Sequence, residues 1–138
     1  MQRVFVIFIK VMAVVSIANG CWMIAHAWSW FAFIPGVTDT GEANAHFIHD
    51  VGIAYVTCGI GLLWCLRHLD RAWPVFAGIA LFNGGHAIGH VVEILAGQLP
   101  ASHWLIDLPL VFLPSLALVL SAIPTNWQRL SGHPARPV

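Results

Sequence analysis

Residues 72–95 read AWPVFAGIALFNGGHAIGHVVEIL, and residues 72–92 contain no Asp, Glu, Lys or Arg. A membrane-spanning helix needs about 20 mostly apolar residues. The stretch therefore predicts a transmembrane helix over residues 74–96. It also contains His86, His90 and Glu93, which an α-helix would place on one face because it turns about 100° per residue. Ionisable side chains inside a membrane span are costly, so they mark a candidate functional site.

The composition of the whole chain supports a membrane protein. Of its 138 residues, 59% are hydrophobic and only 9% are charged, whereas soluble domains carry about 25% charged residues. We expect a single integral membrane domain over residues 1–138, with the lipid bilayer as its surroundings. The formal net charge is zero, and no cluster of basic residues is present that would bind the phosphates of a nucleic acid. Cys21, Cys58 and Cys65 form no CxxC pair, and we expect them to be reduced and apolar in character.

Four apolar segments are long enough to cross a bilayer. They cover residues of about 11–28, 47–66, 74–96 and 105–123, and they predict an all-α fold, a four-helix transmembrane bundle. Pro74 suits the first turn of the third helix. Pro109 and Pro114 fall inside the fourth segment, where each removes a backbone N–H, so an irregular start is expected there.

The basic residues predict the orientation of this bundle. All six precede the first span, lie between the second and third, or follow the fourth: Arg3, Lys10, Arg67, Arg71, Arg129 and Arg136. The opposite loops carry Asp39 and Glu42 but no basic residue. By the positive-inside rule, both termini are predicted to be cytoplasmic.

Histidines and carboxylates gather toward the outer ends of the predicted helices. With a rise of about 1.5 Å per residue, Glu93, His90 and His86 lie roughly 5, 9 and 15 Å below the outer end of the third span. The second span enters from the same side, and its first turns carry His46, His49 and Asp50. These six residues are predicted to form one site in the outer half of the bundle. His26, His103 and Asp107 lie near the same boundary, and the sequence leaves open whether they join it.

Imidazole and carboxylate groups suggest a transition metal as the ligand. Zinc, iron and copper all bind these groups, and histidines at positions i and i+4 of one helix can hold a single ion. The sequence lacks the HExxH pattern of zinc proteases. A simpler interpretation remains open, in which the same side chains form hydrogen bonds between helices and only fix their packing. The group around His46 also has a simpler interpretation, as a helix start that Asn44 caps.

The segment PGVTDTGEANAHFIHDVGIAYVTCGIGLLW, followed by HAIGHVVE, resembles a group of small four-span bacterial inner-membrane proteins to which no function is assigned. The resemblance covers about half of the chain. It implies a location in the bacterial inner (plasma) membrane and a four-helix bundle. In size and span count the chain is also similar to DoxX-like membrane proteins, some of which take part in quinone-dependent redox chemistry.

The resulting hypothesis is a multi-pass membrane protein with a periplasm-facing His/carboxylate site for a transition metal, namely zinc, iron or copper. One alternative is a redox subunit with b-type haem or a link to quinones, since two histidines on facing helices can ligate haem iron. Others are a small transporter or proton relay and a structural assembly subunit. The sequence leaves open whether the protein is an enzyme, and whether it forms a homo-oligomer or joins a larger membrane complex.

Overall fold

The computed structural model describes residues 1–135, which are mainly helical and include no β-strand. The predicted all-α fold is confirmed. In chain order the elements are α1 (Gln2–Ala25), α2 (Ala27–Phe33), the 3-10 helix η1 (Val37–Thr40), α3 (Ala45–Arg67), α4 (Trp73–Leu95), α5 (His103–Ile106), the π-helix η2 (Leu108–Phe112), α6 (Leu113–Ala122) and α7 (Pro124–Ser131).

Three helices, α1, α3 and α4, are long and apolar enough to cross a membrane. Residues 108–122 and α7 pass the same test together, but they are bent by 91° where they join. The chain therefore has three candidate spans, or up to four if the bent pair counts as one. In the 18-residue apolar stretches of α1, α3 and α4, only 28%, 28% and 22% is buried within the protein, so a surrounding bilayer would cover most of their apolar surface.

The helix boundaries follow from local sequence signals. Asn44 caps α3, since its side-chain oxygen accepts a hydrogen bond from the backbone N–H of Phe47 at 3.1 Å. Pro74 lies in the first turn of α4. The predicted irregular start of the last apolar segment is also confirmed, because residues 108–112 form a π-helix that contains Pro109. There the carbonyl of Asp107 accepts from both Val111 and Phe112, at 2.8 and 3.0 Å.

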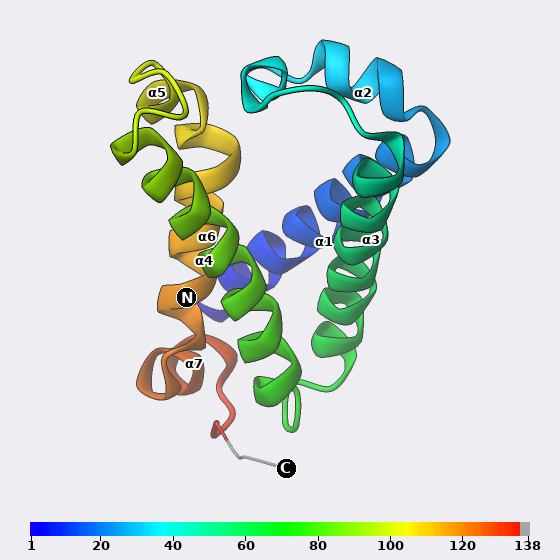
Figure 1. Ribbon diagram of the computed structural model, residues 1–138. Coiled ribbons are helices and arrows are strands. Elements are labelled where there is room, and N and C mark those ends of the chain that lie inside the picture. Colours follow the sequence, from blue (N-terminus) through cyan, green and yellow to red (C-terminus); the bar gives the residue numbers. More distant parts are fainter. Residues whose placement is uncertain (136–138) are drawn as a thin grey trace.

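The long helices form two pairs. Helix α1 packs mainly on α3, and α4 packs mainly on α6 (Figure 1). Helices α1 and α3 pack tightly because glycines lie where the two helices touch. A Cβ added at Gly59 of α3 would lie 2.8 Å from the carbonyl oxygen of Ala13 of α1. Figure 1 shows the α3–α4 turn and α7 toward one end of the molecule, with α2, η1 and α5 toward the other. We call these the α7 end and the α5 end.

The main apolar core joins both helix pairs near the α7 end. Trp127 of α7 is fully buried there and contacts Phe5 of α1 and Phe76 of α4, with ring centroids 5.7 and 5.0 Å apart. A second, smaller cluster consists of Met23, Ala27 and Ile48 and belongs to α1, α2 and α3 alone. The α4–α6 pair therefore contributes no residue to this second cluster.

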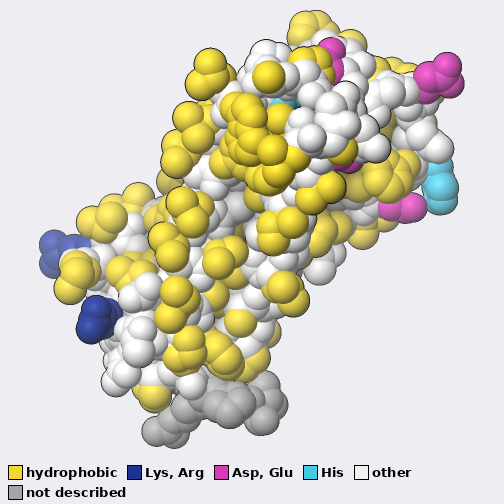
Figure 2. Space-filling model, turned by 60° about the vertical axis from the view of Figure 1, so that its left-hand side comes forward, with side chains coloured by type: hydrophobic (Ala, Val, Ile, Leu, Met, Phe, Trp, Pro, Cys, Tyr) yellow, Lys and Arg dark blue, Asp and Glu magenta, His cyan; other side chains and the backbone are white. Residues whose placement is uncertain are grey.

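Charged side chains are divided between the two ends. In the view of Figure 2 the visible Lys and Arg side chains lie at one end, and visible Asp, Glu and His side chains lie at the other. The described basic residues occur in α1, at the α3–α4 turn and in α7. Arg136, the sixth basic residue of the orientation argument, lies outside the described residues. Hydrophobic side chains cover much of the surface between the ends (Figure 2).

Candidate metal centre

Asp107 is the central residue of a buried polar cluster at the α5 end. It follows the single turn of α5, so it lies four residues after His103 on the same helical face. Oδ2 of Asp107 is 3.0 Å from Nδ1 of His103. The π-helix that follows keeps the carbonyl of Asp107 occupied by two backbone N–H groups, which fixes the backbone under this carboxylate. Single π-turns inside helices are frequent at functional sites.

His90 reaches the same carboxylate oxygen from α4. Its Nδ1 lies 2.8 Å from Oδ2 of Asp107. All three side chains are well shielded from solvent, with exposed fractions of 18% for His90, 7% for Asp107 and 1% for His103. Two imidazole nitrogens therefore converge on a single carboxylate oxygen inside the protein.

A second carboxylate contacts His103 from the opposite side. Oδ2 of Asp39, which belongs to η1, lies 3.1 Å from Nε2 of His103. The Asp39 side chain is 43% exposed, so it lies where the buried cluster meets the surface. His103 is thus held between the carboxylates of Asp39 and Asp107.

A neutral His103 has too few protons to donate a hydrogen bond to both carboxylates. A neutral imidazole carries one N–H and one acceptor nitrogen, so only one of its two carboxylate contacts can then be a hydrogen bond. The other contact needs a second proton on the ring, a proton on a carboxyl group, or a cation. Burial lowers the pKa of His103, but the hydrogen bonds and charges of Asp107 and Asp39 outweigh burial and raise the pKa above its ordinary value of 6.5. The cluster therefore favours positive charge at His103.

His86 extends the cluster toward the middle of α4. Its ring lies 4.7 Å from that of His90, centroid to centroid, in an edge-to-face arrangement. The ring of Tyr55 of α3 also lies near His86, edge-to-face, with the two ring centroids 6.2 Å apart. Pairwise contacts thus link Asp39 at the surface, through the His/Asp cluster and His86, to Tyr55 of α3.

The geometry of three residues suits a metal ion. His90, His103 and Asp107 each offer one ligand atom, and these atoms all lie within 4.8 Å of one another. A tetrahedral zinc ion with bonds of about 2.0–2.1 Å separates its ligand atoms by about 3.3 Å. The nitrogen–oxygen separations of 2.8 and 3.0 Å are slightly shorter, so a small opening of the cluster would admit an ion. Three protein ligands would leave a fourth position for water or another ligand.

The structure brings together only part of the predicted site. Of the six predicted ligands, His90 alone belongs to the close His/Asp group found within residues 1–135. His86 is its neighbour. Glu93 lies half-buried one turn beyond His90 and outside the group. Its backbone carbonyl accepts from Gln98 and Leu99, so this residue helps to end α4.

The predicted ligands of α3 lie elsewhere. His46 and Asp50 form a pair at 3.6 Å on the surface, where their side chains are 87% and 59% exposed. Their exposure follows from the packing of α3, which turns Gly52 and Gly59 toward α1 instead. A role for these residues in the site remains a prediction.

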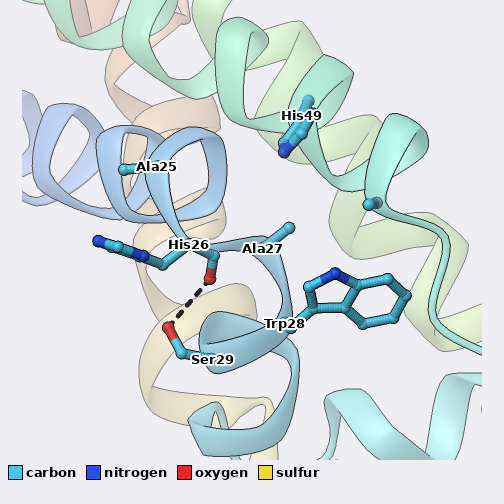
Figure 3. A pocket seen from close by; sticks show the side chains of 7 residues that line it. Ala25, His26, Ala27, Trp28, Ser29 and His49 are labelled. Atoms are coloured by element: carbon cyan, nitrogen blue, oxygen red, sulfur yellow. Dashed lines mark hydrogen bonds between the residues drawn. The ribbon is translucent and has the colours of Figure 1, made fainter.

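His49 and His26 border a separate pocket of about 410 Å³, between the α1–α2 junction and the start of α3. Trp28, Ser29 and three alanines complete its lining (Figure 3). The His26 ring points away from His49 in this view. The hydroxyl of Ser29 donates to the carbonyl of His26 at 3.0 Å, which serves the backbone turn between the helices. The two imidazole rings therefore do not point toward one common ligand position in this pocket.

The contact of Asp39 with His103 was not predicted from the sequence, which left open whether His103 and Asp107 join the site. The spacing of His103 and Asp107, four residues apart just before Pro109, was a signal for a polar pair beside a helix irregularity. No local pattern links Asp39 to His103, because the contact joins residues 64 positions apart.

No known protein family, curated protein or solved structure matches the chain. The resemblance to small four-span proteins and to DoxX-like proteins remains a prediction.

Proposed function

We propose that the protein is a multi-pass protein of the bacterial inner membrane that binds a divalent transition metal through His90, His103 and Asp107. The observation that carries this proposal is the shared oxygen of Asp107, which lies 2.8 and 3.0 Å from the Nδ1 atoms of two histidines. A bound cation would take the place of the protons between these atoms. It would also leave Nε2–H of His103 free to donate to Asp39.

The ligand set favours zinc. Two imidazoles and one carboxylate are common zinc ligands, and iron and copper(II) accept the same groups. A carboxylate that accepts from the far nitrogen of a ligating histidine is typical of zinc proteins, because it fixes the tautomer and raises the basicity of the ligand. Asp39 is placed for that role at 3.1 Å from Nε2 of His103.

The charge distribution supports a periplasmic location for the site. Basic residues occur in α1, at the α3–α4 turn and in α7, whereas η1 and α5 contain none. By the positive-inside rule the α7 end would face the cytoplasm, with both termini there. The cluster at the α5 end would then face the periplasm, where it would exchange metal with the outside.

Metal content per chain tests the proposal. The purified protein is loaded with zinc, iron or copper, passed through a desalting column and analysed by elemental mass spectrometry. We expect about one zinc per chain, and its loss in His90→Gln and in Asp107→Asn. The exposed pair provides a matched control, since His46→Gln and Asp50→Asn change the same residue types outside the cluster. Retention of zinc by the cluster variants, or no bound metal in the unchanged protein, would rule the proposal out.

A proton relay is the second candidate. The contacts from Asp39 through His103 and Asp107 to His90 form a continuous chain of groups that can carry protons. A relay needs no bound ion. Proton flux into proteoliposomes that stops in Asp107→Asn, in a protein without metal, would favour this function over the metal site.

A further inference from the structure

We propose that the connection between α2 and α3, residues 34–44, is a cap on the metal centre, in which Gly36 and Asp39 are positioning residues that turn Nδ1 of His103 toward the ion. The role in metal binding rests on the function proposed above. The placement of the His103 ring by these two residues does not rest on it and can be tested alone.

Asp39 would fix the proton on the ring of His103. Its Oδ2 lies 3.1 Å from Nε2, and an ionised carboxylate can only accept hydrogen bonds. The contact therefore favours a proton on Nε2. Nδ1 faces Asp107 and His90, where an ion would take the place of the second ring proton and bind the lone pair of Nδ1.

Gly36 closes on the edge of the same ring. Its backbone has a φ of 83°, a conformation that favours glycine. A Cβ added at this position would lie 2.7 Å from Cε1 of His103 and 2.9 Å from Cγ2 of Ile106. A side chain at Gly36 would have to push the ring out of place. The same Cβ would lie 3.4 Å from Nδ1 of His103, so the loop backbone at Gly36 lies close to the ring edge that also carries Nδ1.

The cap also connects the two helix pairs. It is continuous with α2 and α3, whose outer cluster of Met23, Ala27 and Ile48 excludes the α4–α6 pair. His103 and Ile106 belong to α5, which leads into that second pair. Gly36 and Asp39 therefore bring the connection between α2 and α3 against His103, whose side chain is 1% exposed.

The loop offers matched controls for both residues. Gly41 has a φ of 113°, so Gly41→Ala strains the backbone as Gly36→Ala does, but its added Cβ would meet nothing within 4 Å. Glu42 is exposed in the same connection, so Glu42→Ala removes a negative charge without touching His103. The experiment compares Asp39→Ala and Gly36→Ala with these two controls in the full-length protein.

The first readout is the affinity for Zn²⁺, measured by competition with a chelator. Loss of the carboxylate partner of a ligating histidine typically weakens metal binding about 10–100-fold, and we expect a decrease of this size in Asp39→Ala and in Gly36→Ala. Glu42→Ala and Gly41→Ala should bind as the unchanged protein does. Equal Zn²⁺ affinity in the unchanged protein and all four variants would overturn the proposal that the connection caps the metal centre. Zinc binding itself would still support the metal site.

The second readout is the Nε2–H group of His103 in the metal-free protein, observed by ¹⁵N NMR of labelled histidine and assigned with His103→Gln. In the unchanged protein Nε2 should carry a proton that is hydrogen-bonded to Asp39, and in Asp39→Ala this hydrogen bond should be lost while Nδ1 keeps its contact with Asp107. An unchanged Nε2 resonance in Asp39→Ala would overturn the positioning role. A protein that binds no Zn²⁺ but shows this change at Nε2 would contradict the metal function and support the positioning.

Discussion

His90 of α4 and Asp107 after α5 lie 17 positions apart, and Nδ1 of the histidine is 2.8 Å from Oδ2 of the carboxylate. The contact joins α4 to the irregular start of the last apolar segment. Both side chains are largely shielded from solvent, with exposed fractions of 18% and 7%. Hydrogen bonds to charged groups are worth more than neutral ones when they are shielded in this way.

Asp107→Asn should destabilise the metal-free protein. The amide is uncharged and its oxygen cannot serve both histidines as the carboxylate does, so we expect a loss of about 1–3 kcal/mol in the free energy of unfolding. Denaturant unfolding in mild detergent measures the change. Asp50→Asn is the control, because Asp50 is 59% exposed and its replacement should change stability by much less. Equal effects of both substitutions would contradict the structural role of Asp107.

The stability of the metal-free protein should depend on pH through His103. Its pKa is raised in the folded state, so the folded protein binds the proton more tightly than the unfolded chain does. The resulting stabilisation is complete below the ordinary pKa of about 6.5 and is lost as the pH rises through the raised value. Unfolding measured with a chelator present should show this decline, and His103→Gln should flatten it. If the stability of His103→Gln declined with rising pH just as that of the unchanged protein does, a group other than His103 would cause the decline.

Trp127→Ala should weaken the core at the α7 end. The indole is fully buried against Phe5 and Phe76, and truncation of a buried aromatic residue costs about 3–5 kcal/mol. Thermal unfolding in detergent measures the loss. Trp28 is 64% exposed, so Trp28→Ala should have a small effect. The zinc content should stay the same in Trp127→Ala wherever the protein remains folded, since Trp127 packs at the end opposite α5.

The predicted orientation can be tested by labelling single cysteines in a variant that lacks Cys21, Cys58 and Cys65. Glu42→Cys, in the connection before α3, should react with a membrane-impermeant maleimide added to intact spheroplasts. Asp70→Cys, between α3 and α4, should react only after the membrane is permeabilised. The reverse pattern would place the termini in the periplasm and the His/Asp cluster toward the cytoplasm.

Local sequence patterns were sufficient to predict much of the fold. The uncharged run at residues 72–92 predicted α4, Asn44 predicted the start of α3, and Pro109 predicted an irregular last segment. Each of these features depends on residues close together in the chain. The first helix begins at Gln2, before the predicted boundary near residue 11, and Lys10 lies exposed on its surface.

The partners of His90 could not be predicted in the same way. A helical face places His86, His90 and Glu93 together, but it does not say which neighbouring helix that face meets. The structure directs His90 to Asp107 because α4 packs on α6, whereas α3 packs on α1 through Gly52 and Gly59. Helix pairing of this kind depends on contacts between distant residues, and the contact of Asp39 with His103 across 64 positions does so as well.

Zinc K-edge X-ray absorption of the loaded protein tests the central claim most directly, since it identifies the atoms bound to the ion. The account predicts only nitrogen and oxygen neighbours at about 2.0–2.1 Å, with the scattering pattern of two imidazoles. The signal should disappear in the triple variant His90→Gln/His103→Gln/Asp107→Asn and persist in His46→Gln/Asp50→Asn. Sulfur neighbours at about 2.3 Å, or an unchanged spectrum in the triple variant, would contradict the assignment of the metal to this cluster.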